Sequence, residues 1–238
     1  MTPYRADLAH VHDDGFGGPA RGAAGVLLAA LEGAGFSSGR VVDLACGSGI
    51  LSQRLSEAGY DVLGIDLSPD MLALARQRAP KATFVEASLL SAELPPCVAV
   101  ALVGEGINYL FDESHSTHAL VKLFARIRAA LPPGGVLLLD AAGPEREPAR
   151  NFREGDGWAV QFEQTIDAQR ETLTRRIVTF RRAGESWRRD EETHRQRLLS
   201  PEEVTELLRE AGFAARVLSA YGEFRFPAGW AGFLATVA

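Results

Sequence analysis

Two acidic residues and a glycine-rich loop carry the chemistry that the sequence suggests most clearly. A short apolar run, residues 41–44, contains Asp43 and leads directly into the glycine-rich residues 45–49. Glycines let a ligand approach the backbone closely, and the free N–H groups at the start of a helix attract polar ligands. Nineteen residues beyond Gly47, a second apolar run ends in Asp66. A carboxylate there can accept hydrogen bonds from both hydroxyls of a ribose, so the pattern predicts a ligand that contains adenosine.

Asp43 discriminates between two classes of such ligands. A dinucleotide would place its pyrophosphate against the loop, where the carboxylate of Asp43 would repel it. The loop also has Ser52 where the dinucleotide fingerprint has its third glycine. S-adenosylmethionine carries a sulfonium and an ammonium group, which a carboxylate attracts. The sequence therefore favours S-adenosylmethionine, with an NAD(P)-dependent oxidoreductase and a non-catalytic protein that binds an adenosyl cofactor as the alternatives.

An alternation of apolar runs and amphipathic segments must position these residues. Most of the expected strands are continuous apolar runs, which is typical of a parallel sheet covered by helices on both faces. We expect strands at 40–44, 62–65, 83–85, 98–103 and 136–141, and helices at 20–31, 50–58, 69–79 and 114–131.

The pattern changes after Gly143. Residues 143–157 read as a polar loop, and 158–166, 172–182 and 186–199 alternate like antiparallel strands. A helix from Ser200 to Gly212 and two strands, 213–221 and 229–237, then complete the chain. We predict that residues 143–199 form an inserted antiparallel ribbon, which acts as a lid or joins two copies of the chain.

Three segments resemble one known family. Residues 43–49 look like motif I of the class I S-adenosylmethionine-dependent methyltransferases, 64–72 resemble their second-strand motif, and 131–135 are similar to the loop before their fifth strand. The resemblance implies a doubly wound α/β fold with a seven-stranded, mostly parallel sheet whose last strand is antiparallel. It also implies a single domain, 1–238, in which residues 1–38 form an N-terminal segment and helix that cover the cofactor.

The resemblance assigns roles to residues at one edge of that sheet. Asp43, Ala45 and Gly47 would line the methionine moiety, Asp66 would hold the ribose, and Leu67 and Met71 would pack on the adenine. Ser88 stands where many members have an acid, so its hydroxyl and the Leu89 N–H would meet the adenine instead. The full set of expected cofactor-binding residues is Tyr4, His12, Asp43, Ala45, Gly47, Gly49, Asp66, Leu67, Met71, Ser88, Leu89 and Glu105.

The acceptor is expected to be a small molecule that is methylated on nitrogen or oxygen. Glu105 follows the fourth strand, where it would face the transferred methyl group, and His194 lies on the ribbon. These two are the candidate catalytic residues, with His12 as a further candidate base, because a hydroxyl acceptor needs a base and a neutral amine does not. We also expect Arg197, on the ribbon, to face the acceptor.

Composition limits the partners. A net charge of −6 is unfavourable for general binding to nucleic acid. No apolar run approaches the roughly 18 residues that a membrane helix needs, and two cysteines allow no disulfide framework. We therefore expect a cytoplasmic monomer or homodimer with no bound metal, no nucleic acid and no membrane partner.

Overall fold

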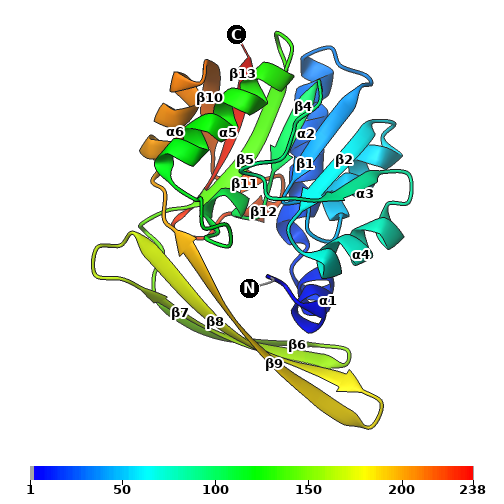
Figure 1. Cartoon of the computed structure of the whole chain (residues 1–238), viewed down its shortest axis with the longest axis vertical. Coiled ribbons are helices and arrows are strands. Elements are labelled where there is room, and N and C mark those ends of the chain that lie inside the picture. The colour runs from blue at the N-terminus through cyan, green and yellow to red at the C-terminus, as the bar shows by residue number, and fades with distance from the viewer. Residues whose placement is uncertain (1–2, 238) are drawn as a thin grey trace.

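The computed structural model describes residues 3–237, so the first two residues of the expected N-terminal segment 1–38, and the last residue of the chain, lie outside the described part. Its centre is a seven-stranded sheet in the order β10-β13-β5-β4-β1-β2-β3 (Figure 1). The strands are β1 (Arg40–Leu44), β2 (Asp61–Asp66), β3 (Thr83–Glu86), β4 (Ala99–Leu102), β5 (Val136–Ala142), β10 (Phe213–Leu218) and β13 (Trp230–Val237). β13 runs antiparallel to both of its neighbours, which confirms the predicted fold class.

Helices cover both faces of this sheet. They are α2 (Gly18–Gly33), α3 (Ile50–Glu57), α4 (Pro69–Arg78), α5 (Thr117–Ala130) and α6 (Pro201–Glu210). Neighbouring residues of β1 alternate between the two cores: Val41 packs with Leu27 of α2, and Val42 belongs to the cluster of Phe124 of α5. Apolar side chains are therefore needed on both faces of the central strands, which is why these strands read as continuous apolar runs.

The parallel register brings the residues expected to do chemistry to one edge of the sheet. Asp43 pairs with Gly64, and Asp66, at the end of β2, pairs with Glu86. The loop after β4 begins at the same edge, because β1 also pairs with β4. Ligands of open α/β sheets bind outside the carboxyl ends of the strands.

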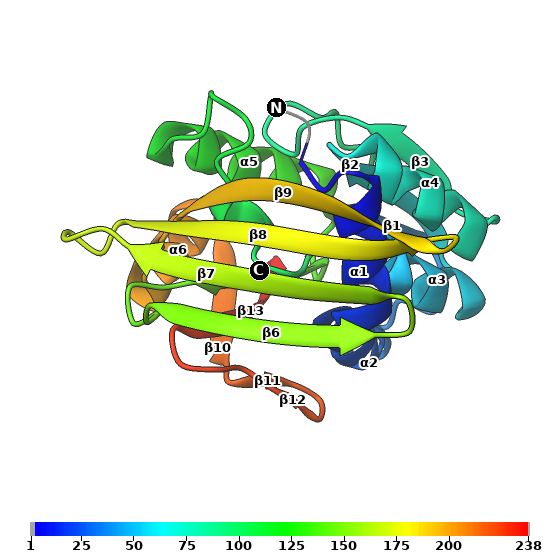
Figure 2. The same ribbon diagram turned by 90° about the horizontal axis from the view of Figure 1, so that it is seen from below.

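A second, four-stranded antiparallel sheet lies across this edge (Figure 2). It consists of β6 (Ala149–Gly155), β7 (Trp158–Ile166), β8 (Thr172–Ala183) and β9 (Ser186–Arg197), and we call it the ribbon. The predicted polar loop 143–157 is wrong in part, because β6 occupies its second half. β9 joins the ribbon to the core, since the Leu110 N–H donates to the Arg195 carbonyl at 2.9 Å.

The N-terminal residues form a further helix, α1 (Ala6–Gly15), which the sequence did not indicate. Leu8 and Val11 of this helix pack on Trp158, Val160 and Ile177 of the ribbon. The expected strand 213–221 is also shorter than predicted, because a small hairpin of β11 (Ala220–Tyr221) and β12 (Phe224–Arg225) follows β10. Within residues 3–237, no helix is both long and apolar enough to cross a membrane.

Candidate functional site

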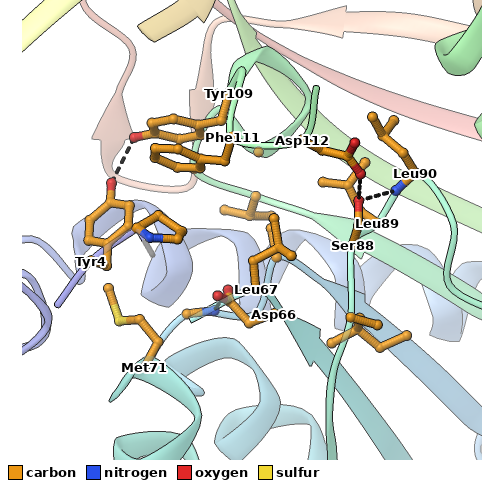
Figure 3. Close-up of a pocket in the computed structure, with 18 of the residues that line it drawn as sticks. Tyr4, Asp66, Leu67, Met71, Ser88, Leu89, Leu90, Tyr109, Phe111 and Asp112 are labelled. Atoms are coloured by element: carbon orange, nitrogen blue, oxygen red, sulfur yellow. Dashed lines mark hydrogen bonds between the residues drawn. The ribbon is translucent and has the colours of Figure 1, made fainter. Parts of the chain in front are cut away.

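A pocket of about 820 Å³ opens at the carboxyl edge of the sheet, between the core and the N-terminal segment (Figure 3). Nine of the twelve residues expected to bind a cofactor line it: Tyr4, His12, Ala45, Gly47, Asp66, Leu67, Met71, Ser88 and Leu89.

Asp66 is held rigidly at this pocket. One of its carboxylate oxygens accepts the Gly47 N–H at 2.8 Å, and the other accepts the Ser68 N–H at 2.8 Å. Burial raises the pKa of Asp66, and the N–H donors of Ser68 and Gly47 oppose that shift. Each oxygen keeps a second lone pair, so the carboxylate can still accept two hydroxyl groups in a fixed orientation.

Two glycines leave the middle of the pocket open. Gly47 has φ +53° and Gly104 has φ +91°, and a Cβ atom built on either one meets nothing within 4 Å. A side chain at either position would be strained and would project into unfilled space. The glycines therefore form a cradle in which a ligand can lie against the backbone, as an adenosyl cofactor with an amino acid moiety requires.

The end of the pocket around Ser88 contains a carboxylate that we did not predict. Asp112, from the loop after β4, lines the pocket and accepts hydrogen bonds from the hydroxyls of Ser88 and Ser114. The pKa of Asp112 is lowered, first by the Ser114 hydroxyl and then by Ser88. Ser88 itself is turned toward Asp112 and accepts the Leu90 N–H, as Figure 3 shows. A carboxylate from the loop after β4 therefore lies beside Ser88, where the segment after β3 has no acid of its own.

Tyr4 closes the pocket on the side of the ribbon. Its hydroxyl lies 2.7 Å from that of Tyr109 (Figure 3), and its carbonyl accepts the Ser68 hydroxyl at 2.9 Å. Phe111 is stacked on Tyr109, with the ring planes 9° apart, and both line the pocket. Tyr4 adopts φ +49°, a conformation that side chains other than glycine rarely adopt, so the contacts around it must hold it there. Tyr109 and Phe111 were not predicted.

Asp43, Gly49 and Glu105 are not among the residues that line the pocket. Asp43 is 2% exposed and accepts the hydroxyl of Ser52, on α3, at 2.6 Å. Gly49 is the N-cap residue of α3, with φ +77°, and a Cβ atom there would lie 2.9 Å from the Cβ of Ala75, so the glycine allows the start of α3 to pack closely on α4.

Burial also makes Asp43 a source of pH dependence. Desolvation raises its pKa from 3.8 to about 7, so between pH 4 and 7 the folded chain keeps a proton that the unfolded chain releases. The free energy of unfolding must then fall as the pH rises through this window. We expect the melting temperature to fall between pH 5 and pH 8, and to fall less in Asp43→Asn. Calorimetry without ligand tests this, with exposed Glu57→Gln as the control; an equal fall in all three proteins would contradict it.

His194 lies on the inner face of β9 and is 2% exposed. Its Nε2 is 2.9 Å from a carboxylate oxygen of Glu192. An ionised carboxylate can only accept, so Nε2 donates and the neutral ring keeps its lone pair on Nδ1. Nδ1 has no hydrogen-bond partner within residues 3–237. The ring packs against Tyr4 and Phe111, with centroids 4.8 and 4.9 Å away, which places His194 directly behind the wall of the pocket.

Glu105 is buried and points toward the ribbon. Its carboxylate forms an ion pair with Arg146, accepts from Gln196 at 2.9 Å and lies 4.0 Å from Arg175. Arg197, by contrast, binds Thr117 and Glu203 on α5 and α6, so the prediction that it faces the acceptor is wrong. Arg197 is three residues after His194 on the same strand, and successive side chains alternate between the two faces of a sheet. The side chain of Arg197 therefore points to the face opposite that of His194.

Asp140, at the end of β5, fixes the loop that carries Glu105. Its carboxylate accepts the N–H groups of Gly104 and Glu105 and the indole N–H of Trp230. Glu105 adopts φ +62°, and these bonds hold that turn. Burial raises the pKa of Asp140 to about 7. Within residues 3–237, no group of three or more His, Cys, Asp or Glu side chains is arranged to bind a metal ion.

Comparisons with known proteins agree with this arrangement. The family model described as a methyltransferase domain matches residues 41–135. The putative methyltransferase YqeM of Bacillus subtilis is 31% identical over 185 residues, which cover 74% of this chain and 73% of that protein. A trans-aconitate 2-methyltransferase of Acidovorax sp. (strain JS42) is 33% identical over 140 residues, which cover 56% of this chain but only 52% of the relative. An S-adenosylmethionine-dependent methyltransferase from Clostridium acetobutylicum has the same fold, with a TM-score of 0.83 and 18% identity over 97% of this chain and 98% of that one.

Proposed function

The chain belongs to the S-adenosylmethionine-dependent methyltransferases that act on small molecules, and from that premise we propose which residues hold the cofactor and which serve the acceptor. One observation carries the assignment. The Asp66 carboxylate, fixed by two backbone N–H groups, faces a pocket that Tyr4 closes on the side of the ribbon. The acceptor would be a compact molecule enclosed between this pocket and the ribbon, methylated on nitrogen or oxygen.

The pocket residues would hold the cofactor in three parts. Asp66 would accept the ribose hydroxyls, Leu67 and Met71 would pack on the adenine, and the Gly47 loop would pass along the amino acid moiety. Ser88 and Leu89 would meet the adenine edge, where Asp112 adds the carboxylate described above. Asp43 does not reach the pocket surface, so it would not contact the cofactor directly. It would instead influence the cofactor through the Gly47 loop, which lies between them.

The aromatic residues Tyr4, Tyr109 and Phe111 separate this pocket from the inner face of the ribbon. When bound, S-adenosylmethionine supplies a methyl group on a positively charged sulfur, which is an intrinsically reactive electrophile. The protein's contribution would be to hold the acceptor atom in line with that methyl group and to exclude water. A neutral amine needs no more than this, whereas a hydroxyl must also lose its proton.

We assign the role of base to His194. Glu192 fixes the tautomer that leaves Nδ1 unprotonated, and Nδ1 has no partner among residues 3–237. A hydroxyl proton could therefore move to Nδ1. Glu105 is less suited to this step, because Arg146 and Gln196 already occupy its carboxylate. His12 is less suited as well, because burial lowers its pKa to about 4 and so makes it a weak base.

The N-terminal segment would cover the cofactor, and contacts with the ribbon would hold this segment in the closed position. The Tyr4 and Arg5 N–H groups both donate to the carboxylate of Glu192 on β9 at 2.9 Å. The Arg5 guanidinium also pairs with Asp190 at 2.6 Å. The cofactor could then enter only when these contacts open.

The test of the cofactor assignment uses S-adenosylhomocysteine, the demethylated product. A ligand at 100 times its Kd stabilises the native state by about 2.7 kcal/mol. For a chain of this size, that corresponds to a rise in Tm of roughly 5–10 °C. We expect this rise with S-adenosylhomocysteine and none with NAD or NADP, measured by differential scanning calorimetry. A rise with NAD alone would favour the oxidoreductase alternative.

The ribbon would also decide whether the protein is a monomer or a homodimer. β6 pairs only with β7, and its residues are exposed along its whole length, including Phe152. A second copy of β6 could pair along this open edge. Sedimentation of the wild-type protein and of Phe152→Pro, which removes a backbone N–H that donates to the Asn151 side chain instead of to β7, distinguishes the two states.

The two cysteines support a reducing compartment. Cys46 and Cys97 are both free and buried. Free thiols persist in the cytoplasm, where disulfides are rare. Cell fractionation with an antibody to the protein tests the proposed cytoplasmic location.

A further inference from the structure

A buried cluster of charged and polar side chains lies between the ribbon and the core, and neither the cofactor pocket nor the proposed base accounts for it. We call it the arginine cluster: Glu105 from the loop after β4, Arg146 from the loop after β5, Arg175 from β8 and Gln196 from β9. Gln196 is fully buried, and the side chains of Arg146 and Arg175 are only 12% and 19% exposed.

The charges of this cluster do not balance. Two guanidinium groups share the single carboxylate of Glu105, and burial, together with the proximity of Arg175, lowers the pKa of Arg146 to about 10. Two further buried carboxylates are already occupied: Asp140 by the N–H groups of Gly104, Glu105 and Trp230, and Glu192, on the same face of β9 as Gln196, by donors of Tyr4, Arg5 and His194. An uncompensated buried charge is costly, so the cluster favours a second anion.

Several hydrogen-bonding atoms of the cluster are also unused. The Nε atoms of both arginines and the Oε1 atom of Gln196 have no hydrogen-bond partner within residues 3–237. Buried polar atoms are nearly always paired in folded proteins, so unpaired ones gathered at one place are available to a polar ligand. The guanidinium fork is suited to carboxylate and phosphate oxygens, which it binds in pairs.

The cluster lies beside the proposed base. Arg175 and His194 are directly opposite each other in the β8–β9 register, and Gln196 follows His194 on the same face of β9. Residues directly opposite in an antiparallel pair project to the same side, so the guanidinium of Arg175 and the ring of His194 share one surface. Glu105 itself is flanked by Gly104 and Gly106, which line the cofactor pocket.

We propose that Arg146 and Arg175 bind an anionic group of the methyl acceptor, a carboxylate or a phosphate ester, and thereby hold the acceptor beside His194, at the side of the cofactor pocket that Gly104 and Gly106 line. This inference rests on the proposed function, because it assigns the acceptor class of the same site. A cationic acceptor is disfavoured on the same grounds: the oxygens of Glu105 are already bound by Arg146 and Gln196, and two guanidinium groups would repel an ammonium group.

The experiment measures binding of small probes to the protein saturated with S-adenosylhomocysteine, at constant ionic strength. The probes are succinate and tricarballylate for carboxylates, glucose 1-phosphate for phosphate esters, glycerol as a neutral molecule and glucosamine as a cation. We expect binding of at least one anionic class, and no binding of glycerol or glucosamine. Comparison of the carboxylate probes with glucose 1-phosphate shows whether the site prefers a carboxylate or a phosphate ester.

The diagnostic variant is Arg175→Gln, since Arg146 continues to neutralise Glu105 in it. We expect the affinity for the anionic probe to fall at least 10-fold, with affinity for S-adenosylhomocysteine within twofold of wild type. The matched control is Arg176→Gln, the next residue of β8, which is exposed and pairs with Glu191 on the other face. It should bind the probe as wild type does, and Arg175→Lys, which keeps the charge but loses the fork, should fall between the two.

Three results would overturn the proposal. They are no anionic probe binding to the saturated protein, equal loss of binding in Arg175→Gln and Arg176→Gln, and binding of glucosamine alone. If Arg175→Gln unfolds at a much lower temperature while its probe affinity is unchanged, the cluster only joins the ribbon to the core, and the proposal is also wrong. Failure of S-adenosylhomocysteine to bind would instead contradict the proposed function. In that case, binding of an anionic probe to the unliganded protein that is lost in Arg175→Gln would still support the anion site, and absence of such binding would contradict it.

Discussion

Replacing His194 by glutamine should lower the rate constant of methyl transfer to a hydroxyl acceptor by about 100- to 10,000-fold, the range that general base catalysis contributes. Glutamine preserves much of the volume but offers no nitrogen lone pair. His194 is behind the pocket wall and contacts Tyr4 and Phe111 but does not line the cofactor pocket. The affinity for S-adenosylhomocysteine should therefore stay within about twofold of wild type, a change under ~0.5 kcal/mol.

The measurement uses an acceptor found by screening metabolites for methyl transfer, with single-turnover kinetics and calorimetry on each variant. Arg197→Gln is the control, because Arg197 is on the same strand but binds Glu203 away from the inner face. It should retain the wild-type rate. If His194→Gln transfers methyl groups to a hydroxyl at the normal rate, His194 is not the base. If the wild-type enzyme and His194→Gln both methylate amine acceptors at the same rate and neither methylates a hydroxyl, the enzyme needs no base.

Replacing Asp66 by alanine should lower the affinity for S-adenosylhomocysteine by about 10- to 150-fold. Hydrogen bonds to a charged group contribute roughly 1.5–3 kcal/mol, and ~1.4 kcal/mol corresponds to tenfold in affinity. The backbone N–H groups of Gly47 and Ser68 hold this carboxylate at the proposed ribose position. Asp66→Ala also loses the hydrogen bonds from the Gly47 and Ser68 N–H groups, so part of the loss of affinity would come from a less rigid Gly47 loop.

Asp61→Ala provides the comparison. Asp61 begins the same strand, is exposed and pairs with Arg40, far from the carboxyl edge. It should bind S-adenosylhomocysteine as wild type does, and circular dichroism should be unchanged in both variants. Unchanged affinity in Asp66→Ala would remove the ribose assignment, whereas equal losses in both variants would indicate a general effect on the fold.

The central sheet could be predicted because its physical requirements are local. A strand covered on both faces needs consecutive apolar residues, as in β4 and β5, which are buried throughout. β6 lacks this signal, since all of its residues are exposed and its pairing with β7 alone defines it. α1 is rich in acidic residues and histidines, and its small apolar face gains a partner only when the ribbon packs on it.

The same distinction applies to the site. Asp66 and Gly47 belong to short motifs whose spacing already implies a strand, a loop and a helix, so they could be predicted. Tyr109 and Phe111 lie in an irregular loop whose position depends on the bridge between Tyr109 and Gln196, which are distant in sequence. The sequence around Arg175 does not distinguish it as a site residue, because β8 has charged residues at neighbouring positions and therefore on both of its faces.

Glu192 carries a consequence for the order of events in each catalytic cycle. The same carboxylate binds the backbone of Tyr4 and Arg5 and orients the ring of His194. If the N-terminal segment opens to exchange the cofactor, Glu192 loses two of its three donors, and the proposed base, His194, is then held less firmly. We therefore expect an ordered cycle in which the cofactor enters first and the demethylated cofactor leaves last. Product-inhibition kinetics would reveal this order, and a random order would mean that the segment opens without disturbing the base.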